Sequence, residues 1–333
     1  MAVIFLVTFI GLMGFGFILP LFPFYAERMG ASPEIITLTM AAFSLGQFVA
    51  APYWGRLSDS IGRKPVLILT LLGSTLSYVI LAYAPNLTVV ILSRVFTGLM
   101  AGNVSIAFAY VADITDDNNR SAGLGKVSAA LGLGFMTGPA IGGLLAGNNV
   151  ENANYLLTAL AAAGINFLAM LAAIVFLKES LDVKKRKPFE GFSKIITLAT
   201  FSPAKSILPL VFCGLIFYTA MSMMESIFPL WANKIFSYGP SHIGGVFFML
   251  GSLGVIIQGG LIGRLTNLLG EKKLIQLAAL SLMAGLILIG SATFTFSLWI
   301  GLFFFGCGSA IFNPSLSSLI SKSADPTSRG QYL

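Results

Sequence analysis

Two ionisable side chains lie deep within apolar stretches of this sequence, where a charge is costly and is kept for a reason. Glu225 lies in YTAMSMMESIFPLW together with Tyr218, and Arg94 lies in LSRVFTGLMAG, which leads to Asn103. A carboxyl group surrounded by hydrocarbon is stabilised in its neutral form, so Glu225 is a candidate proton carrier or a counter-ion for a cationic ligand. Arg94 is a candidate for proton coupling or ligand binding. The alternatives are a structural arginine that bonds carbonyls or reaches outward, and an acid at the edge of its apolar run.

The composition indicates an integral membrane protein. Of 333 residues, 56% are hydrophobic and only 10% are charged, whereas soluble domains are about one-quarter charged. A helix needs about 20 apolar residues to cross a bilayer, and the continuous runs favour helices over a barrel. We predict ten spans, near residues 3–24, 34–54, 66–84, 88–111, 127–146, 155–176, 206–230, 241–262, 274–291 and 296–319.

The basic residues gather in the loops that follow the even-numbered spans, and the opposite side holds only Arg28 and Lys234. The positive-inside rule therefore predicts a cytoplasmic N-terminus. The net charge of +7 is explained by these basic loops, which set the orientation in the membrane. It does not indicate a surface that binds nucleic acid. The basic run KKRK in the segment 178–204 is expected to anchor the chain beside anionic lipid.

A polar segment is repeated along the chain. GRLSDSIGRKP begins at Gly55, and GRLTNLLGEKK begins 208 residues later at Gly263. Such a repeat predicts one helical bundle built twice, with an N-terminal bundle at 1–177, a cytoplasmic linker at 178–204 and a C-terminal bundle at 205–333. The first bundle has six predicted spans and the second four, so we expect two further helices to be missing from this sequence.

Four motifs together resemble the major facilitator superfamily. GRLSDSIGRKP is similar to its cytoplasmic loop signature G-x-L-x-D-x-x-G-R-K, and Arg94 lies in a pattern similar to its fourth-helix motif. The chain resembles the proton-coupled drug exporters of that family, including the tetracycline exporters. This resemblance implies an all-α fold with twelve helices, of which ten are seen here. It also implies a first-helix motif at Gly14, Pro20 and Pro23, a fifth-helix antiporter motif at Gly134, Gly138, Pro139, Gly142 and Gly143, and a cytoplasmic gate at Gly55, Asp59, Gly62, Arg63, Lys64, Asp113 and Arg120.

In the gate segment, Gly55 and Gly62 are expected to permit a tight turn and close helix approach. Asp59 is expected to pair with Arg63 or to face a helix N-terminus, and the resemblance makes this set a cytoplasmic latch. The alternative is a solvated loop whose charges only set the topology. For Asp113 and Arg120 the alternative to the gate is solvated helix capping.

The antiporter motif places glycines 134, 138 and 142 on one helical face. We expect a helix of the other half to pack there, with Pro139 leaving one carbonyl without its helical partner. The functional interpretation is a bendable seam, and the alternative is ordinary close packing of membrane helices.

The sequence points away from several classes of protein. It has no phosphate-binding P-loop, no metal-ligand cluster and a single histidine, so we expect no enzyme, metal site or cofactor. In the tetracycline exporters the first and third helices carry aspartates, where this chain has Gly11 and Ser77. Tetracycline bound to its metal is therefore not the expected substrate.

The predicted function is proton-coupled antiport that exports small amphipathic or cationic compounds by alternating access. Its partners are a small-molecule substrate, protons and membrane lipid, with no nucleic acid, and the chain is expected to act as a monomer in the cell membrane. The alternatives are a sugar or organic-anion uniporter or symporter of the same fold, and a transport-inactive fragment.

Overall fold

The computed structural model describes residues 1–116, 119–186, 188–189 and 208–323. Throughout these ranges the regular structure is helical. The chain divides into two compact units: unit 1 holds Met1–Ala199 with Tyr238–Gly245, and unit 2 holds Thr200–Ser237 with Val246–Leu333. Most of the predicted linker 178–204 lies outside the described residues.

Nine helical stretches within the described ranges are long and apolar enough to cross a membrane. Ten spans were predicted, and the difference has a simple origin. The predicted spans 241–262 and 274–291 lie in one stretch, Pro240–Gly290, of 51 residues. That stretch is broken by the non-helical backbone of Gly270. The architecture is that of an all-helical, multi-pass membrane protein.

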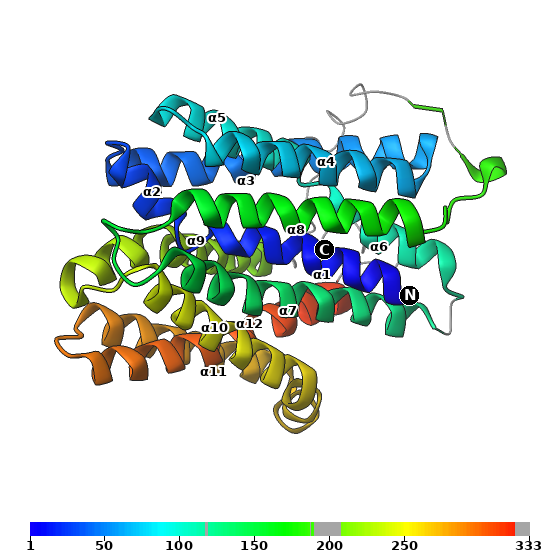
Figure 1. Ribbon diagram of the computed structural model, residues 1–333. Coiled ribbons are helices and arrows are strands. Elements are labelled where there is room, and N and C mark those ends of the chain that lie inside the picture. The colour runs from blue at the N-terminus through cyan, green and yellow to red at the C-terminus, as the bar shows by residue number, and fades with distance from the viewer. Residues whose placement is uncertain (117–118, 187, 190–207, 324–333) are drawn as a thin grey trace. The chain divides into compact units, whose positions relative to one another are not determined.

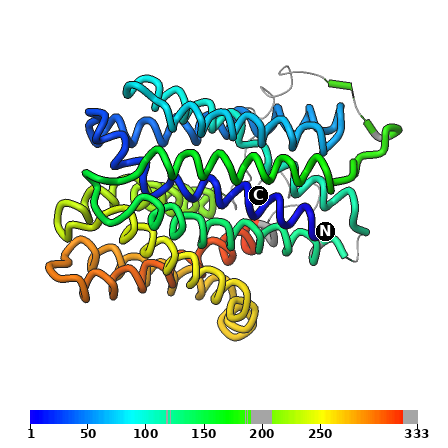
Figure 2. The backbone as a smooth tube through the Cα atoms, in the orientation of Figure 1, coloured from blue at the N-terminus to red at the C-terminus, as the bar shows by residue number. Residues whose placement is uncertain are grey.

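Unit 1 is built around α1, which packs between α7 and α8, while α4 packs against α8 and α5. Figures 1 and 2 show the backbone of α1 running between those of α7 and α8. The helices of this unit are α1 (Ala2–Ile18), α2 (Phe22–Arg28), α3 (Pro33–Ile61), α4 (Arg63–Ala82), α5 (Leu87–Met100), α6 (Asn103–Ile114), α7 (Arg120–Ala146) and α8 (Tyr155–Phe176). Their shared core contains Ile4, Leu67, Leu71, Ile106 and Val111.

Two predicted spans are interrupted in the structure. The first breaks between α1 and α2, where Pro20 lies in the turn and cannot donate a backbone hydrogen bond. The fourth breaks between α5 and α6, at Ala101 and Gly102. A Cβ atom on Gly102 would come within 2.5 Å of the Trp54 ring, so the close approach of α3 at this break requires glycine. The indole nitrogen of Trp54 donates to the carbonyl of Leu99 at 2.6 Å.

The segment predicted as a charged loop from Gly55 to Pro65 is almost entirely helical, which corrects that prediction. Helix α3 continues to Ile61 and α4 begins at Arg63, so the turn is the single residue Gly62. Its φ of +111° is a backbone conformation that favours glycine. Gly55 lies inside α3, and a Cβ atom there would meet open space. Gly55 therefore serves neither a tight turn nor close helix approach.

Unit 2 contains α9 (Leu208–Phe236) and, from Val246 onward, α10 (Pro240–Ile256), a π-helical turn (Ile257–Leu261), α11 (Ile262–Gly290) and α12 (Thr295–Ser323). Helices α11 and α12 form its most extensive contact, and its core includes Phe217, Ala278 and Phe312. Gly270 has φ 72° and ψ 159°, close to the 111° and 160° of Gly62. The sequence repeat is thus also a repeat of backbone conformation.

Candidate functional site

A cavity of about 110 Å³ lies inside unit 1. It is a partly open cavity, lined by residues of α1, α3, α4, α8 and the broken pair α5 and α6. The rings of Phe15 and Phe43 stack at 5.2 Å between centroids and form part of its apolar wall. Its polar lining consists of Gln47, Ser74, Tyr78, Thr97, Asn103 and Asn166. Among the described residues, the lining therefore offers amides, hydroxyls and aromatic faces, but no carboxylate.

Two glycines of α1 make room for the amide side chains of the cavity. Asn103 is the first residue of α6, and its Nδ2 atom would be 3.2 Å from a Cβ atom on Gly11. Asn166 donates to the carbonyl of Ala162 at 3.0 Å, and a Cβ atom on Gly14 would collide with its amide. Gly14 of the predicted first-helix motif thus permits close packing of α1 on α8. Pro23 of the same motif lies in the first turn of α2.

Arg94 is buried next to this cavity, with 4% of its surface exposed. Its guanidinium carbon lies 5.4 Å from the centre of the Phe22 ring and 5.7 Å from that of Tyr78. Its Nε and Nη2 atoms have no hydrogen-bond partner among the described residues. An unpaired buried donor costs about 1–3 kcal/mol, which the two cation–π contacts offset in part. The predicted alternative, a guanidinium bonded to carbonyls, is not seen at these two atoms.

Ser77, which the resemblance aligned with an acid of the tetracycline exporters, is fully buried, and it is not among the described residues that line the cavity. Its hydroxyl donates to the carbonyl of Ser93 at 2.7 Å and lies 2.5 Å from the hydroxyl of Thr97. These contacts join α4 to α5, so Ser77 links the two helices that carry Tyr78 and Arg94.

Glu225 and Tyr218 lie on α9 in unit 2, whereas Arg94 and Asn103 lie in unit 1. Glu225 is half-buried. It forms no hydrogen bond or ion pair with another described residue. The Tyr218 hydroxyl donates to Oδ1 of Asn313 on α12 at 2.9 Å. The sequence analysis did not single out Asn313, because one amide within a long apolar helix is not a distinctive signal. The four residues predicted as one site are thus divided between the units.

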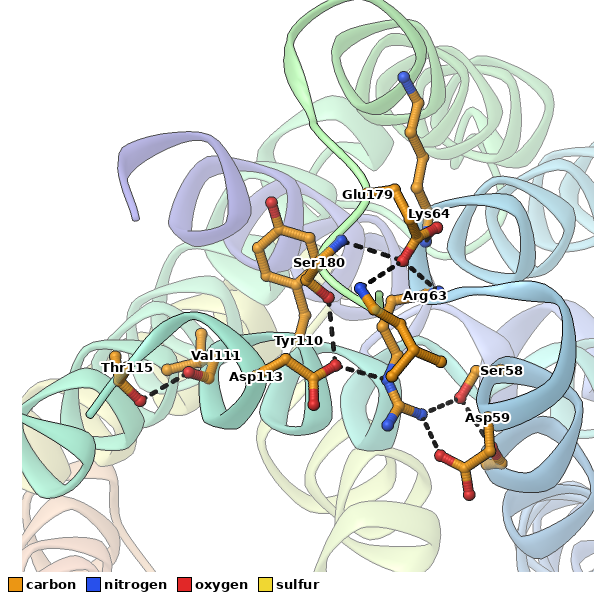
Figure 3. Close-up of polar contacts among 12 residues, drawn as sticks. Ser58, Asp59, Arg63, Lys64, Tyr110, Val111, Asp113, Thr115, Glu179 and Ser180 are labelled. Atoms are coloured by element: carbon orange, nitrogen blue, oxygen red, sulfur yellow. Dashed lines mark hydrogen bonds and ion pairs between the residues drawn. The ribbon is translucent and has the colours of Figure 1, made fainter. Parts of the chain in front are cut away.

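The predicted gate centres on Arg63, whose side chain is 9% exposed. Its Nη1 atom lies 2.6 Å from Oδ1 of Asp59, and its Nε atom lies 2.9 Å from Oδ2 of Asp113 (Figure 3). Nη1 also donates to the Ser58 hydroxyl at 2.6 Å. Arg63 therefore joins α3, α4 and the end of α6 within unit 1. Lys64 donates from Nζ to the carbonyl of Ile174 on α8 at 2.7 Å.

Glu179 belongs to this network although the sequence analysis did not identify it. Its carboxylate accepts the backbone N–H groups of Arg63 at 2.9 Å and Lys64 at 3.1 Å (Figure 3). It therefore occupies the N-terminus of α4, where a negative charge is favoured. Asp59 was expected to pair with Arg63 or to face a helix N-terminus, and the pair with Arg63 is observed. The sequence does contain one indication of Glu179: it is an acid shortly after the predicted span 155–176, at the start of a basic segment.

Three glycines of the predicted antiporter motif, at positions 134, 138 and 142, face α1 of the same bundle and not a helix of the other half as expected. Cβ atoms on Gly134 and Gly138 would come within 2.8 and 2.7 Å of the carbonyl oxygens of Phe9 and Met13. Gly142 likewise lies against the backbone of Phe17 on α1. The absence of these side chains is what brings the α1 and α7 backbones together.

The end of the motif packs against the segment Tyr238–Gly245, which belongs to unit 1. A Cβ atom on Gly143 would lie 2.6 Å from the carbonyl oxygen of Pro240. A Cβ atom on Gly244 would lie 2.5 Å from the carbonyl oxygen of Pro139. Arg120 of the predicted gate is the first residue of α7.

Comparison with known proteins agrees with this architecture. The chain is 32% identical to Multidrug resistance protein 2 of Bacillus subtilis over 278 residues, which is 82% of this chain and 68% of that protein. It is 30% identical to the class E tetracycline resistance protein of Escherichia coli over 331 residues, 98% of this chain and 80% of that protein. The crystal structure of the human organic anion transporter MFSD10 superimposes with a TM-score of 0.70 at 25% identity, covering 99% of this chain and 87% of that one. A sequence profile described as Major Facilitator Superfamily matches residues 4–333. The chain therefore belongs to the Major Facilitator Superfamily, a family of membrane transporters.

Proposed function

We propose that this chain is a secondary active transporter that exports small amphipathic compounds in exchange for protons. The observation that carries the proposal is the cavity of unit 1, whose lining combines amide and hydroxyl groups with the stacked rings of Phe15 and Phe43. A concave site with an apolar wall and a few polar groups suits ligands that have both characters. Relatives with multidrug and tetracycline resistance in their names support export.

The cavity supports amphipathic substrates more than cationic ones. The sequence analysis allowed both, with Glu225 as a counter-ion. Within the described part of the chain no Asp or Glu lines the cavity, and the buried charge beside it is the positive one of Arg94. A cation there would lack a countercharge and would be repelled by the guanidinium.

Glu225 is the proposed proton carrier. It is half-buried on an apolar helix of unit 2, and ionisable groups at such positions are typical of proton relays. Arg94 and Asn103 in unit 1, and Tyr218 in unit 2, are proposed to take part in handling the proton or the substrate.

The Arg63 network is proposed as a latch on the cytoplasmic side. It holds the ends of α3, α4 and α6 of unit 1 together through one buried guanidinium. Together with the distribution of basic residues, this supports a cytoplasmic N-terminus in the cell membrane. We further propose that the protein acts as a monomer within lipid, without nucleic acid and without enzymatic activity.

The test uses everted membrane vesicles with an acidified lumen and a pH-sensitive dye. Adding a transported amphipathic compound should release protons through the wild-type protein and not through Glu225→Gln. The matched control is Glu151→Gln, which removes an exposed acid from the segment that joins α7 to α8, and it should behave as wild type. Equilibration of the compound without proton movement would instead favour the sugar or organic-anion uniporter. Absence of any transport would favour a transport-inactive chain.

A further inference from the structure

We propose that the cavity of unit 1 binds the acidic end of an amphipathic compound, with Arg94 as the positive charge that holds it. The inference rests on the proposed function and deepens it, because it names organic anions with an aromatic or aliphatic body as the substrate class. Three observations support it. Arg94 is buried without a counter-ion among the described residues, Tyr78 contacts both Arg94 and the cavity, and helix α6 starts in the cavity wall.

The charge of Arg94 is not balanced within the described part of the chain. No ion pair joins Arg94 to another described residue. The planes of Phe22 and Tyr78 cover the guanidinium at 5.4 and 5.7 Å, while Nε and Nη2 remain unpartnered. A buried charge is normally paired with an opposite one. Two adjacent N–H groups of a guanidinium match the two oxygens of a carboxylate.

Tyr78 connects Arg94 to the cavity. Tyr78 carries the guanidinium on its ring and also lines the cavity, and Thr97, three residues after Arg94 on α5, lines it too. A carboxylate entering the cavity at Tyr78 and Thr97 therefore reaches the guanidinium when the Tyr78 ring turns aside. In this arrangement Tyr78 occupies the position of the ligand while the site is empty.

A helix N-terminus lies in the same wall. Helix α6 starts at Asn103, and both Asn103 and Val104 line the cavity. The N-terminus of a helix carries a partial positive charge, and helices that start within a membrane commonly direct this end at anionic groups of a substrate. The C-terminus of α5, which carries the opposite partial charge, ends at the same wall, where Ala101 also lines the cavity. The attraction for an anion therefore comes mainly from the full charge of Arg94, with no acid among the described residues that line the cavity. The stacked rings of Phe15 and Phe43 provide a surface for the apolar body of the compound.

The experiment measures binding, by calorimetry on the purified full-length protein, of three probes with one aromatic body: 2-naphthylacetate, 2-naphthylacetamide and 2-naphthylethylamine. In the wild type the carboxylate should bind about tenfold or more tightly than the amide, which corresponds to one charge-assisted contact, and the amine should bind most weakly. Arg94→Gln should bring the ratio of carboxylate to amide close to one, and Arg94→Lys should retain part of it. The matched control is Arg28→Gln, because Arg28 also stacks on a ring, that of Tyr155 at 5.6 Å, but is exposed.

A second pair of variants keeps Arg94 in place, so the test does not depend on one substitution folding well. Gly11 lines the cavity, and a Cβ atom there would point at the amide of Asn103. Gly11→Asp should invert the preference in favour of the amine, whereas Gly11→Asn, of the same size without the charge, should not. The proposal is overturned if the wild type binds the amine most tightly, if no probe binds at millimolar concentration, or if neither Arg94→Gln nor Gly11→Asp changes the ratios.

These outcomes can be told apart from failure of the proposed function. Binding is measured without a proton gradient, so a carboxylate preference that depends on Arg94 supports the site even if the vesicles release no protons. Conversely, proton release driven by the amine, together with no carboxylate preference, would support the exporter and reject the anion site.

Discussion

Glu179 accepts a hydrogen bond from the backbone N–H of Arg63 at 2.9 Å, although the two residues are 116 positions apart. The exit of α8 is thereby fixed to the start of α4. The same Arg63 uses its side chain to hold Asp59 and Asp113, so its backbone and guanidinium join four segments of unit 1. This arrangement, and the glycine contacts of α7, lead to four predictions.

The first prediction concerns the cap on α4. Glu179→Gln keeps an oxygen acceptor but removes the charge, and only one of the two carboxylate oxygens remains to accept N–H groups. The free energy of unfolding should fall by about 0.5–2 kcal/mol, the range for the loss of a helix cap. Thermal unfolding of the purified protein measures this. Glu151→Gln, which removes an acid from an exposed position, should leave the melting temperature unchanged, and equal effects of both variants would contradict the cap.

The second prediction concerns coupling between Arg63 and Asp113. Removing one partner leaves the other without its ion pair, which is costly when the group is largely buried, as Arg63 is. Arg63→Gln should therefore lower the free energy of unfolding by about 2–4 kcal/mol. The double variant with Asp113→Asn should be less destabilised than the sum of the single variants. Strict additivity in denaturant titrations would show that the contact contributes no coupling.

The third prediction compares two glycines of the repeated segment. Gly62→Ala places a side chain at φ +111° and against the Glu179 carboxylate, so it should destabilise the protein by about 1–3 kcal/mol. Gly55→Ala adds a Cβ atom in open space within α3 and should be neutral or stabilising by about 0.5–1 kcal/mol. Unfolding of the two variants under one condition tests the difference. Similar losses for both would show that the segment is an ordinary loop.

The fourth prediction concerns the contact between α1 and α7. Gly138→Ala would bring a Cβ atom within 2.7 Å of the Met13 carbonyl and 2.8 Å of the Gly16 Cα atom. Because both are backbone atoms, the helices must separate, and we expect a loss of about 1–3 kcal/mol together with reduced transport. The matched control is Gly125→Ala on the same helix, where a Cβ atom meets nothing within 4 Å. Full transport and stability in Gly138→Ala would mean that the contact is not needed.

Several features could be predicted from the sequence because they depend on local composition. Long runs with little charge have few alternatives to membrane helices, so the all-helical class follows from the residues alone. The repeat between Gly55 and Gly263 also indicated equivalent turns, and Gly62 and Gly270 do share a positive φ. The interruptions near Pro20 and at Gly102 were missed because the apolar runs continue through them without a change in hydropathy.

The candidate site shows where local pattern ceases to be informative. Arg94 and Glu225 were identified because charge is rare in apolar runs, but what surrounds a charge depends on other helices. The aromatic rings on Arg94, the Glu179 cap on α4 and the contact of α7 glycines with α1 all join residues far apart in sequence. The amino-acid sequence by itself determined the membrane class, the repeat and the rare charges, because solvation acts on each segment separately. Only the tertiary structure decided which groups meet, because helix packing selects partners by shape and close approach, which no single segment encodes.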